Sequence, residues 1–143
     1  MLMPTRRRTL APRGKTPVLP AWDRRDRISA MSAVTISPRR KNRNHYFHLL
    51  ADNRNIRALD VVEFLRHLLR HIRGPITIVW DRSNTHDRAK AVRAWLAKQR
   101  KVRTERFPGY APELNPDEQV WSHVKHGRLA NFVPQDSSHL RRR

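Results

Sequence analysis

The segment that most constrains the fold is residues 107–125, FPGYAPELNPDEQVWSHVK, because it specifies a proline-rich loop and then an abrupt helix start. Asn115 is a favoured N-cap residue, and Pro116 suits the first helical position. Asp117 and Glu118 fall in the first turn, where the helix dipole favours negative charge. The apolar residues that follow recur at helical spacing, which predicts a buried face formed by Val120, Trp121 and Val124.

Glu118 has two interpretations. It stands in the N3 position relative to Asn115, so it fits a capping box in which its carboxylate reaches back to the N-cap amide. It also fits a carboxylate that the loop places for chemistry. A second acidic residue upstream favours the chemical interpretation.

That second residue is Asp81. It directly follows the apolar, β-branched run ITIVW at residues 76–80, which predicts a strand buried on both faces of a sheet. Open α/β sheets place their ligands at the carboxyl ends of such strands. Asp81 also fits a turn former, or the cap of a helix predicted over about residues 87–99. In the chemical interpretation, Asp81 and Glu118 converge on one metal site.

The rest of the chain predicts an α/β fold with helices packed on a mixed sheet. Two β-rich segments joined by a basic turn indicate an antiparallel hairpin, at residues 27–37 and 45–50. An amphipathic helix begins at Ala58 and ends before Gly74. A further short strand is predicted over residues 101–107.

Charge indicates the partner. The 143 residues include 31 Lys and Arg against 12 Asp and Glu, a net charge of +19, so a polyanion is expected and nucleic acid fits best. Arginine suits bidentate phosphate recognition. Cysteine is absent and no apolar run reaches membrane-spanning length, so a cytoplasmic protein with no membrane partner is expected. The residues expected to contact DNA are Arg6, Arg7, Arg8, Arg13, Arg82 and Lys125.

Two motifs carry a family resemblance. WDRSNTH at residues 80–86, followed by residues 107–125, resembles the catalytic domain of bacterial insertion-sequence transposases, in the mariner-related branch of the DDE superfamily. PTRRRTLAPRGKTPVL near the start and VVEFLRHLL in the middle extend the resemblance over most of the chain.

The resemblance implies an RNase H-like fold, action on DNA at transposon ends and targets, a homodimer and a nucleoid location. It also implies that three carboxylates hold two Mg²⁺ or Mn²⁺ ions. Asp81 matches the second carboxylate of the family motif and Glu118 matches the third. His86 occupies a position where the family often has His, and both it and Asn115 are candidate supports for the site.

The chain departs from the family at its start. The family's first carboxylate precedes the equivalent of residues 2–14, yet no Asp or Glu occurs here before Asp23, and neither Asp23 nor Asp26 matches its position. We therefore expect a catalytic-domain fragment without the first strand, impaired in cleavage. Its expected parts are a basic Pro/Arg-rich segment at the sheet edge (1–20), a partial endonuclease domain (21–131) and a basic tail (132–143). The alternative is a non-catalytic, basic nucleic-acid-binding remnant.

Overall fold

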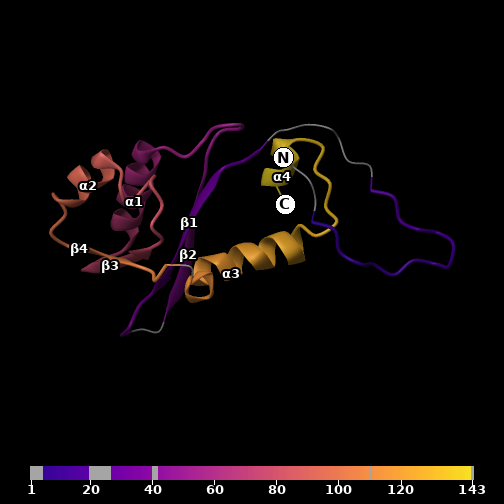
Figure 1. Cartoon of the computed structure of the whole chain (residues 1–143), viewed down its shortest axis with the longest axis horizontal. Coiled ribbons are helices and arrows are strands. Elements are labelled where there is room, and N and C mark those ends of the chain that lie inside the picture. Colours follow the sequence, from indigo (N-terminus) through magenta and orange to yellow (C-terminus); the bar gives the residue numbers. More distant parts are fainter. Residues whose placement is uncertain (1–4, 20–26, 40–41, 110, 143) are drawn as a thin grey trace.

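The computed structural model describes residues 5–19, 27–39, 42–109 and 111–142. Strands and helices alternate along these residues, and the helices pack on two small sheets (Figure 1). The expected α/β fold class is confirmed. Asp23 and Asp26 lie outside the described residues.

The first sheet is an antiparallel hairpin of β1 (Ala30–Ile36) and β2 (Arg43–Leu49), in which Ala30 is opposite Leu49. The second is a parallel pair of β3 (Ile76–Trp80) and β4 (Val102–Arg106). Across the described ranges no strand pairing joins the two sheets, so the predicted single mixed sheet is divided between β1 and β3. The predicted burial of β3 on both faces is wrong, because Val79 is 47% exposed.

The core is built on helix α1 (Ala58–His71), with a contribution from α2 (Lys90–Leu96). The buried apolar side chains of α1 recur at helical spacing and cluster with Val92 of α2, which is fully buried. Side chains from both sheets pack against this cluster: Met31 and Ala33 of β1, Tyr46 of β2, and Ile78 and Trp80 of β3. Helix α1 therefore holds the two sheets together in the absence of strand pairing between them.

The third helical region follows the loop after β4. It begins with a 3₁₀ turn, η1 (Pro112–Leu114), continues as α3 (Pro116–His123) and ends in a π-helical turn, η2 (Val124–Arg128). Figure 1 shows α3 beside the β1–β2 hairpin and away from α1 and α2. The predicted face of Val120, Trp121 and Val124 is only partly buried, because a single hairpin covers it.

The N-terminal segment contains no strand over residues 5–19, although it is predicted to lie at a sheet edge. It starts beside η2, where Asn131 N donates to Thr5 O at 3.0 Å, and it then extends away from both sheets (Figure 1). A turn at Gly14, whose φ is +81°, reverses its direction. No helix among the described residues is long and apolar enough to cross a membrane.

The C-terminal residues form a short helix where the sequence predicts a basic tail. Helix α4 (Ser137–Arg141) starts at Asp136, whose side chain accepts a hydrogen bond from His139 N. Ser137 Oγ donates to Asp52, and Arg141 lies 3.0 Å from the same carboxylate, Nη2 to Oδ1. Asp52 therefore joins α4 to the loop after β2.

Acid is expected to release α4. The hydrogen bond from Ser137, with the hydrogen bond and charge of Arg141, holds the pKa of Asp52 below its ordinary value. The unfolded chain therefore takes up this proton more readily, so the stabilisation is present at neutral pH and is lost as pH falls below about 4. The protection of the α4 backbone amides from solvent exchange, relative to the intrinsic exchange rate at each pH, should fall under acid, and Asp52→Asn should abolish that pH dependence. An unchanged acid response in Asp52→Asn would contradict the assignment.

Candidate functional site

Asp81 lies at the carboxyl end of β3, and its side chain is 65% exposed. Its Oδ1 accepts a hydrogen bond from Ser83 N at 2.9 Å, so it does shape the following turn. His86 Nε2 lies 2.7 Å from the same oxygen, and the His86 ring lies against Trp80 with centroids 4.9 Å apart. The turn and the histidine fix the carboxylate while most of it faces solvent.

Glu118 is exposed in the first turn of α3. Asn115 caps that helix, as predicted, because its Oδ1 accepts from Asp117 N at 3.1 Å. The capping-box interpretation of Glu118 is not supported: Asn115 N donates to Pro112 O at 3.0 Å instead. The Glu118 carboxylate is therefore not used by the helix start.

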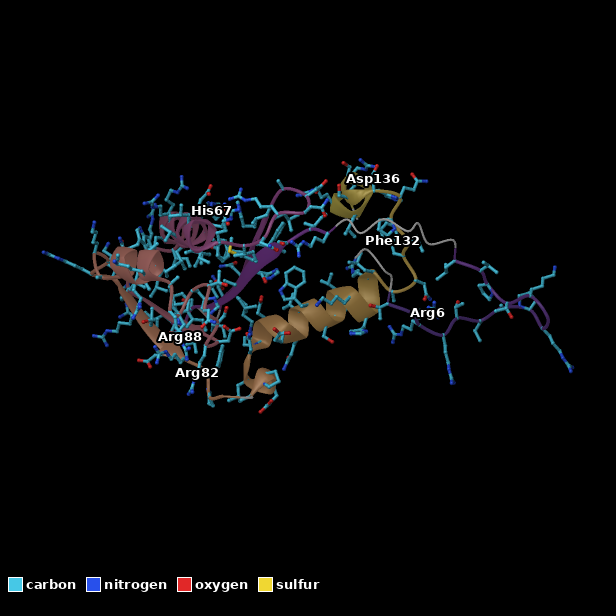
Figure 2. The ribbon with its side chains drawn as sticks, turned by 45° about the horizontal axis from the view of Figure 1, so that its top comes forward. Arg6, His67, Arg82, Arg88, Phe132 and Asp136 are labelled. Atoms are coloured by element: carbon cyan, nitrogen blue, oxygen red, sulfur yellow. The ribbon has the colours of Figure 1, made fainter. Side chains whose placement is uncertain are left out.

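The parallel sheet places the start of the loop that leads to Glu118 beside Asp81. Phe107 N donates to Trp80 O at 2.9 Å, one residue beyond β4, so the loop that leads to α3 starts beside Asp81. Arg82 reaches this loop, since its Nη1 lies 4.0 Å from the position of a Cβ built on Gly109. Figure 2 shows Arg82 on the side of the second sheet that faces the start of α3.

The start of α3 is fixed by Asp117. The sequence predicts for this residue only a negative charge that the helix dipole favours. Asp117 Oδ2 accepts from Ser32 Oγ of β1 at 2.6 Å and from Trp121 Nε1 at 3.1 Å. Trp121 Nε1 also lies 2.7 Å from Ser32 Oγ. His45 Nε2 of β2 lies 3.5 Å from Asp117 Oδ1, a buried oxygen without a hydrogen-bond partner. We call these four residues the Asp117 clasp; it joins α3 to the hairpin one residue before Glu118.

The remaining predicted cations fall into two groups. Arg6 and Arg7 lie beside α3 and η2, where Arg7 Nη1 donates to His126 O at 3.1 Å. Arg8 and Arg13 are exposed on the extended N-terminal segment, and Lys125 is exposed on η2. The first group lines a concave surface together with residues of α3 and η2.

Within the described part of the chain, no three His, Cys, Asp or Glu side chains lie close enough together to hold a metal ion. The carboxylates of Asp81 and Glu118 are both exposed oxygen donors, the type of ligand that Mg²⁺ and Mn²⁺ prefer. The donor chemistry fits a divalent cation, but the described residues offer two of the three expected carboxylates.

The alternating strands and helices of the described residues form an α/β fold that is similar to an RNase H-like domain. The sequence model of the DDE superfamily endonucleases matches residues 2–141. The chain therefore belongs to the DDE superfamily endonuclease family. Comparison with the curated proteins gives no match.

Solved structures of similar fold include three Mos1 complexes. A Mos1 transposase paired-end complex with the left transposon end superposes with a TM-score of 0.65 at 19% identity, covering 99% of this chain and 42% of that one. A Mos1 strand transfer complex gives 0.61 at 20% identity, with coverage of 99% and 41%. A Mos1 mariner paired-end complex with Mn gives 0.62 at 18% identity, with coverage of 99% and 42%. The chain thus spans about two fifths of the length of these proteins.

Proposed function

We propose that this chain is the catalytic-domain part of an insertion-sequence transposase, and that Asp81 and Glu118 bind a divalent cation used in DNA transposition. The observation that carries the proposal is the Phe107–Trp80 hydrogen bond, which starts the Glu118 loop at the strand end that bears Asp81. Family membership and two exposed carboxylates support it.

The proposed residues have separate roles. Asp81 and Glu118 hold the cation, and His86 keeps the Asp81 carboxylate oriented through its 2.7 Å contact. Arg82, beside Gly109, offers a positive charge to a phosphate that approaches this loop. A pair of such cations, Mg²⁺ or Mn²⁺, supplies activation of the attacking oxygen and stabilisation of the leaving oxygen in phosphodiester chemistry.

DNA is the proposed partner. The net charge of +19 favours a polyanion, and one of the similar Mos1 structures is a transposase paired-end complex with the left transposon end. A bacterial insertion-sequence origin, homodimeric assembly and a nucleoid location are further parts of the same proposal. The described residues supply two proposed acidic ligands where the family motif implies three, so weak cleavage is expected.

A second candidate function is a non-catalytic module that binds nucleic acid through its arginines. The observation that favours it is the lack, among the described side chains, of a cluster with three metal-binding groups. This module needs neither Asp81 nor Glu118.

Cation binding tests the proposal. Mn²⁺ titrated into the protein should bind, and Asp81→Asn or Glu118→Gln should each weaken the affinity about tenfold or more, which is about 1.4 kcal/mol per tenfold. Because both side chains hold the same ion, the double variant should be little weaker than either single variant. Isothermal titration calorimetry and the electron paramagnetic resonance signal of free Mn²⁺ measure this.

Glu113→Gln is the matched control, because Glu113 is an exposed carboxylate of η1 in the same loop. It should leave Mn²⁺ affinity within about twofold of the unaltered chain, which is less than 0.5 kcal/mol. Equal affinities for all three single variants would remove Asp81 and Glu118 from the site and leave the non-catalytic module.

A further inference from the structure

We propose that a groove along α3 is a binding site for the phosphodiester backbone of a DNA strand. The groove has a volume of about 510 Å³ and lies between the N-terminal segment and the helix. We call it the α3 groove; its principal lining side chains are Arg6, Arg7, Gln119, Ser122, His123 and His126. The inference deepens the proposed function and rests on it for the identity of the polyanion.

The groove is built by Asn131, which fixes the N-terminal segment against the end of the helical region. Asn131 Oδ1 accepts from Arg7 N at 2.8 Å, and its Nδ2 donates to Arg7 O at 2.9 Å. Its backbone N also donates to Thr5 O. Asn131 has a φ of +57°, a left-handed conformation that asparagine tolerates better than most residues. These bonds hold both backbone polar groups of Arg7 and leave Arg6 at the groove.

The lining chemistry selects an anion. The side chains that line the groove are cationic, or neutral with hydrogen-bonding groups, and no Asp or Glu is among them. On the helical wall, Gln119, Ser122 and His126 follow one another at spacings of three and four, so they lie along one face. A row of donors opposite two arginines suits an extended chain of phosphates better than a single small anion.

The α3 groove lies close to Glu118, one of the two proposed cation ligands. Glu118 lies on α3, five residues before the groove residue His123, which is about 7.5 Å at 1.5 Å per residue. A strand in the groove would therefore pass toward the start of α3. Figure 2 shows Arg6 near the opposite end of α3 from Arg82, so the two arginines mark the two ends of this path. We infer that the groove holds phosphates that flank the one near Asp81 and Glu118.

The test combines affinity with localisation. Binding of a fluorescein-labelled oligothymidylate to the full chain is measured by anisotropy across a series of salt concentrations. Arg6→Gln should weaken binding about fivefold and lower the slope of log Kd against log salt by about 1, because one phosphate contact is lost. Arg66→Gln is the matched control, because Arg66 is exposed on α1 outside the groove and its substitution removes the same charge. It should change Kd by less than about twofold.

Nuclear magnetic resonance shows where the strand lies. In the titration of ¹⁵N-labelled protein with the same oligonucleotide, the amide signals of Gln119, Ser122 and His126 should shift, and those of α1 should not. Equal losses for Arg6→Gln and Arg66→Gln, or shifts confined to other elements, would overturn the groove. Shifts caused equally by inorganic phosphate at the same phosphate concentration would also overturn it, because an extended backbone must bind more tightly than a single anion.

Failure of the groove and failure of the proposed function are separable. Mn²⁺ binding that depends on Asp81 and Glu118 does not need Arg6, so it persists if only the groove is wrong. If DNA shifts the amide signals of the groove residues, but Asp81→Asn and Glu118→Gln leave the Mn²⁺ affinity unchanged, the groove is supported and the proposed cation site is wrong.

Discussion

Phe64→Ala is expected to lower the free energy of unfolding by about 3–5 kcal/mol, the usual cost of removing a buried phenylalanine side chain. Phe64 is 6% exposed and belongs to the α1 cluster, which side chains of both sheets contact. Because no strand pairing joins the described parts of β1 and β3, a cavity under α1 weakens the connection between the sheets as well as the core. Single domains are stable by only about 5–15 kcal/mol, so this variant should lose a large share of the free energy of unfolding.

Urea denaturation followed by circular dichroism measures the effect. Leu59→Ala is the matched control, because Leu59 is on the same helix but is 72% exposed, and it should change stability by about 0.5 kcal/mol or less. Similar midpoints for Phe64→Ala and Leu59→Ala would show that α1 does not carry the core. A non-cooperative transition in the unaltered chain would show that residues 1–143 do not form this core alone.

The secondary structure was predictable wherever local signals coincide. The bounds of β3, Ile76–Trp80, follow from a β-branched run between Gly74-Pro75 and Asp81, and the structure confirms them. Helix α2 is shorter than predicted and begins at Lys90, because residues 84–87 form turns and Asp87 is bound by Arg106 at 2.7 Å. That ion pair joins residues distant in the chain, so local periodicity does not reveal it.

Strand pairing and the C-terminal helix were harder to predict, because both also depend on contacts between residues distant in the chain. Alternation of apolar residues predicts strands but not their neighbours, so the sequence does not show that β1 and β3 remain unpaired in the described structure. Residues 132–143 read as a basic tail because no apolar periodicity marks α4. The helix is instead held by Asp52, which lies 85 positions before Ser137 in the chain.

The positions of Asp81 and Glu118 could be predicted, because a strand end and a helix start both leave signals in the sequence. The structure leaves Asp81 and Glu118 exposed, with Asp81 beside the start of the loop between β4 and α3 and Glu118 just after its end, while their role in cation binding stays a prediction. The Asp117 clasp left no comparable signal. Ser32 lies 85 residues before Asp117, and nothing local marks either residue as a partner of the other.

Asp117→Ala is expected to detach the start of α3 from the hairpin and to destabilise the chain by about 2–3 kcal/mol, the range for losing hydrogen bonds to a charged, partly buried acceptor. Ser32 Oγ and Trp121 Nε1 both donate to Asp117 Oδ2, and His45 lies beside the other oxygen. Without the carboxylate, these groups lose their shared partner. Mn²⁺ affinity should also fall, because Glu118 follows Asp117 directly and loses its fixed position.

Asp117→Asn is the control that separates geometry from charge. Its side-chain oxygen still accepts from Ser32 and Trp121, so stability and Mn²⁺ affinity should stay closer to those of the unaltered chain than in Asp117→Ala. Solvent exchange of the Trp121 indole N–H reports the clasp directly, and it should accelerate in Asp117→Ala but not in Asp117→Asn. If both variants accelerate it equally, the negative charge rather than the hydrogen-bond geometry holds α3 on the hairpin. If neither does, Ser32 Oγ, 2.7 Å from the indole nitrogen, is sufficient to hold Trp121 and the clasp does not depend on Asp117.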